Sequence, residues 1–170
     1  MVQAWKKIVV MLPTYNEAAN IASLIEALLV LHIPRLHVLV VDDNSPDGTA
    51  HIVSSLMRKH RNVHLLLRRI HKGRGTAGIA GYRKALEMGA DVICEMDADF
   101  SHDPRFLPSL LKKLHSADVV LGSRAVRGGS DIDRPFLRQI LTRLANLYIA
   151  ILLGLHVKDC NSGYRCFRRH

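Results

Sequence analysis

Five short apolar runs, separated by segments with helical spacing, limit what this chain can fold into. A run without polar alternation is typical of a strand that is covered on both faces. Such strands, alternating with helices at this spacing, predict an α/β fold with a Rossmann-like, mostly parallel sheet and right-handed crossovers. The expected strands cover residues 8–12, 38–41, 63–67, 92–99 and 119–122.

The segments between these runs carry the helices that such a sheet requires. The first segment has apolar residues at helical spacing and a proline beyond its end. The last begins with Asp103 and Pro104, since aspartate suits the cap and proline the first helical position. The expected helices cover residues 18–31, 49–60, 75–88 and 104–115.

Two aspartates one residue apart, Asp97 and Asp99, end the run that begins at Val92. Ligands of parallel sheets collect outside the carboxyl ends of the strands, and side chains at i and i+2 of an extended backbone point the same way. Two such carboxylates suit Mg²⁺ or Mn²⁺, which fill their remaining positions with water and phosphate oxygens. The alternative that these residues leave open is a solvated turn or helix cap after a strand.

The composition narrows the class of partner. The 170 residues, 48% of them hydrophobic, suffice for one domain with a real core. A formal net charge of +9 indicates an anionic partner, either nucleic acid, a phosphorylated substrate or an acidic membrane surface. Nucleic acid is not expected, because only 5% of residues are aromatic and they do not interleave with basic residues. Three cysteines without metal-type spacing indicate reduced thiols in the cytosol.

From Pro135 onward, apolar residues recur at helical spacing with arginines beside them, and we expect a C-terminal amphipathic helix. Its apolar run over residues 147–155 is far shorter than the ~20 residues that a membrane-spanning helix needs. It is either a packed core helix or a helix in the membrane interface, with arginines near lipid headgroups. The apolar residues are Leu137, Ile140, Leu141, Leu144, Leu147 and Ile151, and the arginines are Arg134, Arg138 and Arg143.

Five motifs at the ends of the expected elements make the chain resemble a known family. In this order they are similar to family 2 glycosyltransferases of the nucleotide-sugar-binding A fold. They look most like dolichol-phosphate mannose synthases and their bacterial polyprenol-phosphate relatives, and the resemblance spans nearly the whole chain. The motifs are Pro13-Thr14-Tyr15-Asn16-Glu17, Val41-Asp42-Asp43-Asn44-Ser45-Pro46-Asp47-Gly48-Thr49, Glu95-Met96-Asp97-Ala98-Asp99, Gly122-Ser123-Arg124 and Asp159-Cys160-Asn161-Ser162-Gly163-Tyr164-Arg165.

The resemblance implies a site for a nucleotide-sugar donor. Tyr15 would offer the nucleoside an aromatic face and Glu17 an acceptor, while Val41 and Asp43 would bind the base and ribose. Contact of the Asp47 turn with the donor is an alternative to plain turn and cap chemistry, which explains that turn better. The donor-binding residues implied in this way are Pro13, Tyr15, Glu17, Val41, Asp43, Asp97, Ala98, Asp99 and Arg124.

The resemblance also implies a metal and a catalytic group. Asp97 and Asp99 would hold Mg²⁺ or Mn²⁺ on the donor diphosphate. Ser101 stands where some relatives have a glutamine ligand, and would be a weaker third ligand. Arg124, just past the expected fifth strand, would reach the diphosphate or the acceptor phosphate and complete the catalytic group with the two aspartates.

On this resemblance the chain is an inverting, metal-dependent mannosyltransferase. It would move mannose from GDP-mannose to a polyprenyl or dolichyl phosphate, whose phosphate group Arg124, Arg138 and Thr142 would bind. It would act peripherally at the cytoplasmic face of a membrane, on an anionic surface, and the family admits a membrane-embedded partner subunit. Two alternatives stay open, namely another donor such as UDP-glucose on the same lipid, and a noncatalytic nucleotide-binding or membrane-surface module.

A single glycosyltransferase domain is expected over residues 1–170. Residues 1–126 would be its nucleotide-sugar-binding half, and residues 127–170 would face the acceptor and the membrane. Relatives of this type continue past the last motif with another strand and a basic loop that closes over the donor. The chain is therefore expected to be truncated compared with them.

Overall fold

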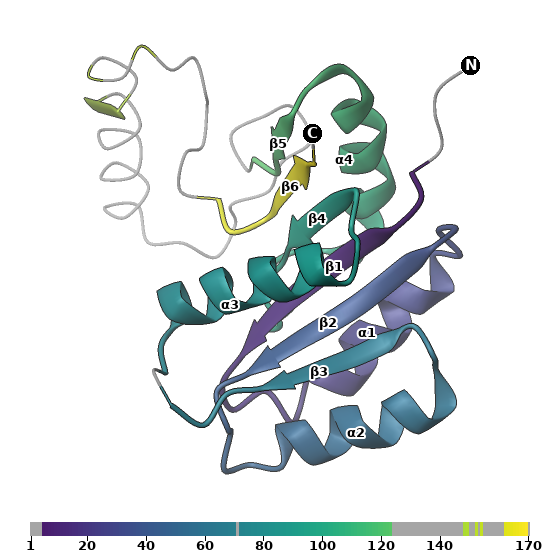
Figure 1. Ribbon diagram of the computed structural model, residues 1–170, viewed down its shortest axis with the longest axis vertical. Coiled ribbons are helices and arrows are strands. Elements are labelled where there is room, and N and C mark those ends of the chain that lie inside the picture. Colours follow the sequence, from purple (N-terminus) through teal and green to yellow (C-terminus); the bar gives the residue numbers. More distant parts are fainter. Residues whose placement is uncertain are drawn as a thin grey trace.

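A six-stranded sheet is the centre of the part of the chain that the structure describes (Figure 1). The computed structural model describes residues 5–70, 72–123, 148, 149, 152, 154 and 162–169. Its strands lie in the order β3-β2-β1-β4-β6-β5. They are β1 (Ile8–Thr14), β2 (Leu36–Asp42), β3 (Val63–Leu67), β4 (Val92–Glu95), β5 (Val119–Leu121) and β6 (Arg165–Arg168).

Five of these strands run in one direction, and β6 runs against them. Strand β1 pairs in parallel with β2 and β4, and β2 with β3, whereas β6 is antiparallel to both β4 and β5. The predicted α/β fold with a mostly parallel sheet is thus confirmed. Strand β6 is not predicted from the sequence, because its four residues, two apolar side chains between two arginines, are too few for a periodic signal.

Helices cover both faces of the sheet. Successive residues of β1 face opposite sides, so Ile8, Val10 and Leu12 pack with α1, α2 and α4, while Val9 and Met11 pack with α3. In Figure 1, α3 crosses the near face and α1 and α4 lie behind the sheet. The helices are α1 (Ile21–Val30), α2 (Thr49–Lys59), α3 (Arg74–Glu87) and α4 (Leu107–Lys113), with short 3₁₀ turns at Pro104–Phe106 and Leu114–Ser116 on either side of α4.

Helix α3 lies unusually close to the sheet. A Cβ atom on Gly81 would collide with Met11 Sδ and would approach Val41 Cγ2 to 3.0 Å. Only glycine therefore fits between this helix and the strands beneath it. The close packing brings the first residues of α3 to the edge where β1, β2 and β4 end.

Several predictions fall on residues outside the described part of the chain. Arg124, Arg138 and Thr142 are among them, and so is nearly all of the expected C-terminal amphipathic helix. The division into residues 1–126 and 127–170 likewise stays a prediction. In the described ranges, none of the helices has the length and apolar character needed to cross a membrane.

Candidate functional site

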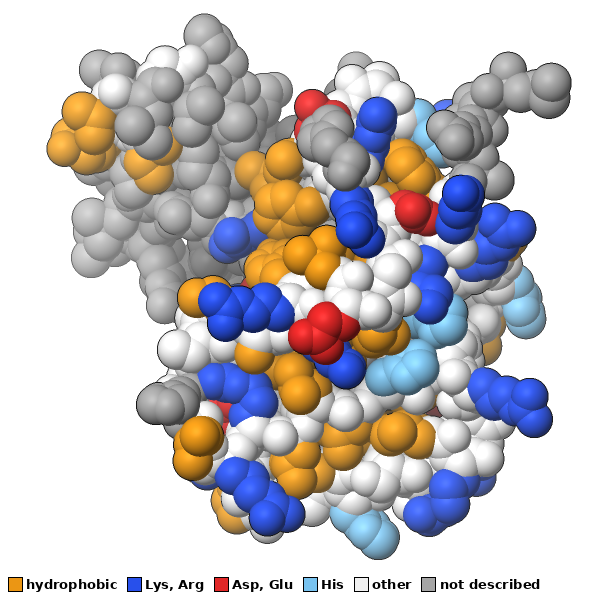
Figure 2. Space-filling view, viewed as in Figure 1, with side chains coloured by type: hydrophobic (Ala, Val, Ile, Leu, Met, Phe, Trp, Pro, Cys, Tyr) orange, Lys and Arg blue, Asp and Glu red, His pale blue; other side chains and the backbone are white. Residues whose placement is uncertain are grey.

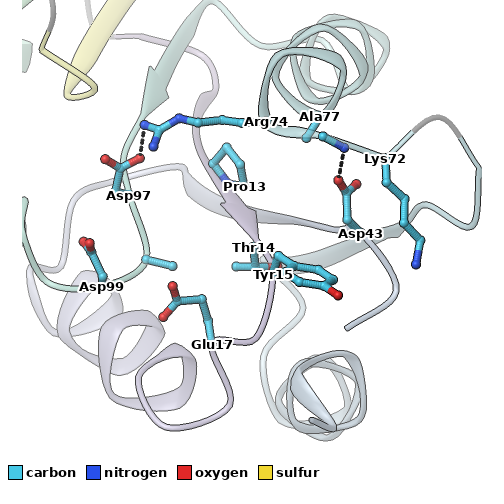
Figure 3. A pocket seen from close by; sticks show the side chains of 12 residues that line it. Pro13, Thr14, Tyr15, Glu17, Asp43, Lys72, Arg74, Ala77, Asp97 and Asp99 are labelled. Atoms are coloured by element: carbon cyan, nitrogen blue, oxygen red, sulfur yellow. Dashed lines mark hydrogen bonds and ion pairs between the residues drawn. The ribbon is translucent and has the colours of Figure 1, made fainter. Parts of the chain in front are cut away.

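A cavity of about 540 Å³ opens at the edge where β1, β2 and β4 end and α3 begins (Figure 3). A volume of this size suits a small ligand or nucleotide. Seven of the residues predicted to bind a donor line it together. The full lining is Pro13, Thr14, Tyr15, Glu17, Asp43, Lys72, Gly73, Arg74, Ala77, Asp97, Ala98 and Asp99.

The two aspartates occupy one side of this cavity, and Glu17 lies between Asp99 and Tyr15 (Figure 3). Strand β4 ends at Glu95, so both aspartates lie on the turn beyond it and not on the strand. Within that turn, the N–H of Ser101 donates to Asp99 Oδ1 over 2.9 Å. Burial acts to raise the pKa of Asp99, but the hydrogen bonds from the Ser101 hydroxyl and N–H outweigh it and lower that pKa. Asp99 is therefore ionised at neutral pH and suited to a cation.

This pair of carboxylates fits Mg²⁺ or Mn²⁺ held jointly with a phosphate. Residues 5–70, 72–123 and 162–169 contain no cluster of three or more histidine, cysteine, aspartate or glutamate side chains that could enclose a metal ion. Magnesium and manganese do not need one, since they bind through one or two carboxylates plus water and substrate oxygens. Ser101 supports Asp99 through its hydrogen bonds, and its role as a further ligand stays a prediction.

Asp97 is held from the far side by His102, which the sequence did not single out, and by Gly163 of the last motif, to which the sequence assigned no role. Its N–H donates to Nδ1 of the buried His102 over 3.0 Å, so the neutral imidazole carries its proton on Nε2. The His102 ring lies 5.3 Å from the ring of Tyr164. A Cβ on Gly163 would come within 2.9 Å of His102 Cε1 and 3.0 Å of Asp97 Oδ2. The chain before β6 thus packs directly on the Asp97 carboxylate and leaves no room for a side chain at Gly163.

The opposite side of the cavity is formed by the basic segment between β3 and α3. Asp43 accepts hydrogen bonds of 2.6 Å from Arg68 Nη1 and from the N–H of Gly73. The side chains of Arg68 and Asp43 are only 9% and 8% exposed, so this ion pair is shielded from water. It ties the segment to the end of β2 and so brings Lys72 and Arg74 to the cavity (Figure 3). Neither was predicted as a site residue, because a run of basic residues in a loop usually marks a solvated surface.

Asp43 also lines the cavity. Its carboxylate already accepts two hydrogen bonds from within the protein. A carboxylate has about four acceptor positions, so two hydrogen bonds leave capacity for a ribose hydroxyl. Val41 lies elsewhere, because its side chain is fully buried in the core beneath α3. Any contact that Val41 makes with a ligand would come from its main chain.

The loop after β1 supplies the remaining wall. Tyr15 is 57% exposed at the cavity mouth, which leaves its ring face available. Glu17 accepts a 2.9 Å hydrogen bond from Asn20 Nδ2, which orients its carboxylate. Asp47, by contrast, accepts hydrogen bonds from Thr49 and from the N–H of Ala18. This arrangement supports the turn and cap interpretation of Asp47, which is not among the lining residues.

Residues 9–170 match the protein family described as Glycosyl transferase family 2. The chain is 42% identical over 162 residues to an undecaprenyl-phosphate mannosyltransferase of Micrococcus luteus, which covers 95% of this chain and 66% of that protein. It is 40% identical over 171 residues to a polyprenol monophosphomannose synthase of Mycolicibacterium smegmatis, which covers 99% of this chain and 64% of that protein.

A solved structure has the same fold. It is glucosyl-3-phosphoglycerate synthase from Mycobacterium tuberculosis in complex with Mn²⁺, UDP and glucosyl-3-phosphoglycerate, with a TM-score of 0.68 and 22% sequence identity. The match covers 95% of this chain and 56% of that one. The predicted glycosyltransferase A architecture is thereby confirmed. The chain spans about two thirds of the length of the curated relatives that it matches.

Proposed function

We propose that this chain, which belongs to glycosyl transferase family 2, transfers mannose from GDP-mannose to a polyprenyl or dolichyl phosphate with inversion at the anomeric carbon. The observation that carries the proposal is one cavity with two aspartates on one side and an exposed aromatic ring with further polar groups on the other. The names of the two curated relatives, a mannosyltransferase and a phosphomannose synthase that act with polyprenyl lipids, support the choice of sugar and acceptor.

The donor would lie across the cavity. Its nucleoside would contact Tyr15, Glu17 and Asp43, and its diphosphate would lie beside Asp97 and Asp99. A divalent cation held by these two carboxylates would supply neutralisation of the charge that develops on the departing nucleoside diphosphate. The structural neighbour from Mycobacterium tuberculosis was crystallised with Mn²⁺ and UDP, which supports this assignment.

The acceptor needs little activation by the protein. A phosphate monoester has a second pKa of about 6, so at neutral pH it is mostly a dianion and already a nucleophile. One of its oxygens would form the new bond to the anomeric carbon while the bond from that carbon to the diphosphate oxygen breaks. The task of the chain is then to hold two phosphates near one carbon in line. We assign this task to Arg124, and to Arg138 with Thr142 on the acceptor side.

Because the proposed acceptor is a lipid, the chain would act at a membrane surface. Lysine and arginine side chains are widely distributed on the face shown in Figure 2, and acidic side chains are few. With a formal net charge of +9, such a surface would be attracted to anionic lipid headgroups. We therefore place the chain peripherally on the cytoplasmic face of a membrane, with residues 127–170 toward the lipid and with room for a membrane-embedded partner subunit.

A thermal-shift panel with GDP, UDP and their sugars, each with and without Mn²⁺, tests this proposal. A ligand at 100 times its dissociation constant stabilises the folded chain by about 2.7 kcal/mol. We expect stabilisation by GDP and GDP-mannose that requires Mn²⁺, followed by lipid-linked mannose in a transfer assay. Stabilisation by UDP at concentrations about tenfold below those of GDP would favour the glucosyl alternative. No response to any nucleotide would favour a noncatalytic membrane-surface module, and a response to nucleotides without transfer would favour a noncatalytic nucleotide-binding module.

A further inference from the structure

The guanidinium of Arg74 is paired with the Asp97 carboxylate, which a metal ion would need as a ligand. Arg74 Nη2 lies 2.5 Å from Asp97 Oδ1, and Figure 3 shows the side chain reaching along the cavity wall to this aspartate. The Arg74 side chain is 66% exposed, whereas that of Asp97 is 23% exposed. Among the described residues the arginine is held through its guanidinium, while the backbone N–H of Asp97 is held by His102.

Electrostatics explain why the guanidinium stays there. The hydrogen bond to Asp97 is the main cause that raises the pKa of Arg74; burial acts the other way, and the charges of Asp97, Glu95 and Asp99 add to the rise. The Arg74 guanidinium therefore offsets the negative charge of Asp97 and Asp99, which line the same cavity. Without any cation, these carboxylates would repel one another across a partly desolvated cavity.

A divalent ion and the Arg74 guanidinium cannot both stay on Asp97 at low cost. A metal ion would lie about 2.1 Å from a carboxylate oxygen, and the guanidinium bonds an oxygen of the same group, so two cations would stand within a few ångströms of each other. The pair that must break joins a largely exposed arginine to a partly exposed aspartate, and ion pairs open to water are weak. Arg74 is also the first residue of α3, between Gly73 and Gly75, and a Cβ on Gly75 would have no atom within 4 Å. Because most of the Arg74 side chain is exposed, it can turn away without disturbing the packing.

We propose that Arg74 is an exchangeable counter-ion, which neutralises Asp97 in the empty cavity and passes to the donor diphosphate when the metal ion binds Asp97. The planar guanidinium group can form two parallel hydrogen bonds with a phosphate, just as it can with a carboxylate. The metal ion takes Asp97 from Arg74, and the diphosphate offers Arg74 a new anionic partner. Metal and nucleoside diphosphate therefore bind cooperatively. The inference rests on the proposed nucleotide-sugar site and adds a residue to it.

The substitution R74Q gives two effects of opposite sign. It removes the competitor for Asp97, so Mn²⁺ alone should bind about two- to fivefold more tightly. It also removes a charged hydrogen-bond donor to the diphosphate, so GDP at saturating Mn²⁺ should bind about tenfold more weakly, or worse. A residue that merely stabilises the fold would lower both affinities together.

The measurements are the electron paramagnetic resonance signal of free Mn²⁺ without nucleotide, and calorimetry of GDP with Mn²⁺ in excess. R69Q is the matched control, since Arg69 belongs to the same basic segment, is exposed and does not line the cavity. R74K keeps the charge but loses the fork, and should leave the Mn²⁺ affinity close to that of the unsubstituted chain while GDP binding weakens.

The outcomes separate this inference from the function on which it rests. Opposite shifts in R74Q, absent in R69Q, support the exchange. Mn²⁺ affinity in R74Q equal to that in R69Q, or GDP affinity unchanged, overturns the exchange but leaves the nucleotide site intact. No binding of Mn²⁺ or GDP by the unsubstituted chain overturns both.

Discussion

Replacing Gly163 with alanine should test how tightly the C-terminal segment supports the turn of the proposed metal site. The added Cβ would lie 2.9 Å from His102 Cε1, 3.0 Å from Asp97 Oδ2 and 3.1 Å from Arg74 Nη2. Contacts this short force at least one neighbour to move, and overpacking of this kind typically costs about 1–3 kcal/mol.

The surroundings decide which neighbour moves. His102 is buried, accepts the N–H of Asp97 and lies against the Tyr164 ring, so it cannot yield without breaking that hydrogen bond. Arg74 is largely exposed and can swing away cheaply. The Asp97 carboxylate is left to rotate out of its position. We therefore expect G163A to lower the free energy of unfolding by about 1–2 kcal/mol, and Mn²⁺ affinity in the presence of GDP by about tenfold.

Two assays and one control measure this effect. Urea unfolding reports the loss of stability, and a Mn²⁺ titration at fixed GDP reports the displaced carboxylate. G75A is the control, because a Cβ there would meet no atom within 4 Å and alanine favours the helix, so its unfolding free energy should be unchanged or higher by up to about 1 kcal/mol. If G163A matched G75A in both assays, the packing of Gly163 on Asp97 would have no functional role.

Three further predictions concern the metal, the acceptor and the membrane. Asp99→Ala should abolish most of the Mn²⁺-dependent affinity for GDP-mannose; calorimetry that shows unchanged binding, with or without a chelator, would remove the metal from the site. Arg138→Ala should raise the apparent KM for polyprenyl phosphate while GDP-mannose binding stays within about twofold, since a charged hydrogen bond worth about 1.5–3 kcal/mol is lost only where it is made. The chain should sediment with anionic liposomes and less so as salt rises, because each basic residue near such a surface contributes about 1 kcal/mol; equal, negligible sedimentation with anionic and neutral liposomes would contradict the surface assignment.

The strands and helices of the described fold follow from the sequence because each is a separate local pattern. Their ends are less predictable. Helix α1 begins at Ile21 and not at residue 18, because the carbonyl of Glu17 already accepts the N–H groups of Asn20 and Ile21 in a preceding turn. Strand β4 stops at Glu95, four residues early. Phe100 then has a φ of 59°, a left-handed conformation that is costly for a bulky residue and reverses the chain.

The early end of β4 changes the reason why Asp97 and Asp99 lie in one cavity. Asp97 and Asp99 were expected to share a direction because side chains two apart in a strand do so, yet neither lies on a strand. They line the same cavity because the turn from Asp97 to His102 is closed on itself by two hydrogen bonds, Ser101 N–H to Asp99 and Asp97 N–H to His102. The type and spacing of these residues identify the site. Their geometry depends on hydrogen bonds that spacing alone does not reveal.

The residue roles that the sequence did not predict depend on contacts between distant parts of the chain. Arg74 reaches Asp97 because the close approach of α3 to β1, which only glycine at position 81 permits, carries the start of this helix to the edge of the sheet. Insertion of β6 between β4 and β5 carries Gly163 onto the same aspartate. A larger residue at position 81 would lift α3 and withdraw Arg74 without touching the cavity. The charge balance at Asp97 therefore depends partly on how α3 packs on β1 at Gly81. Gly81 does not line the cavity, so ligand contacts alone would not reveal this dependence.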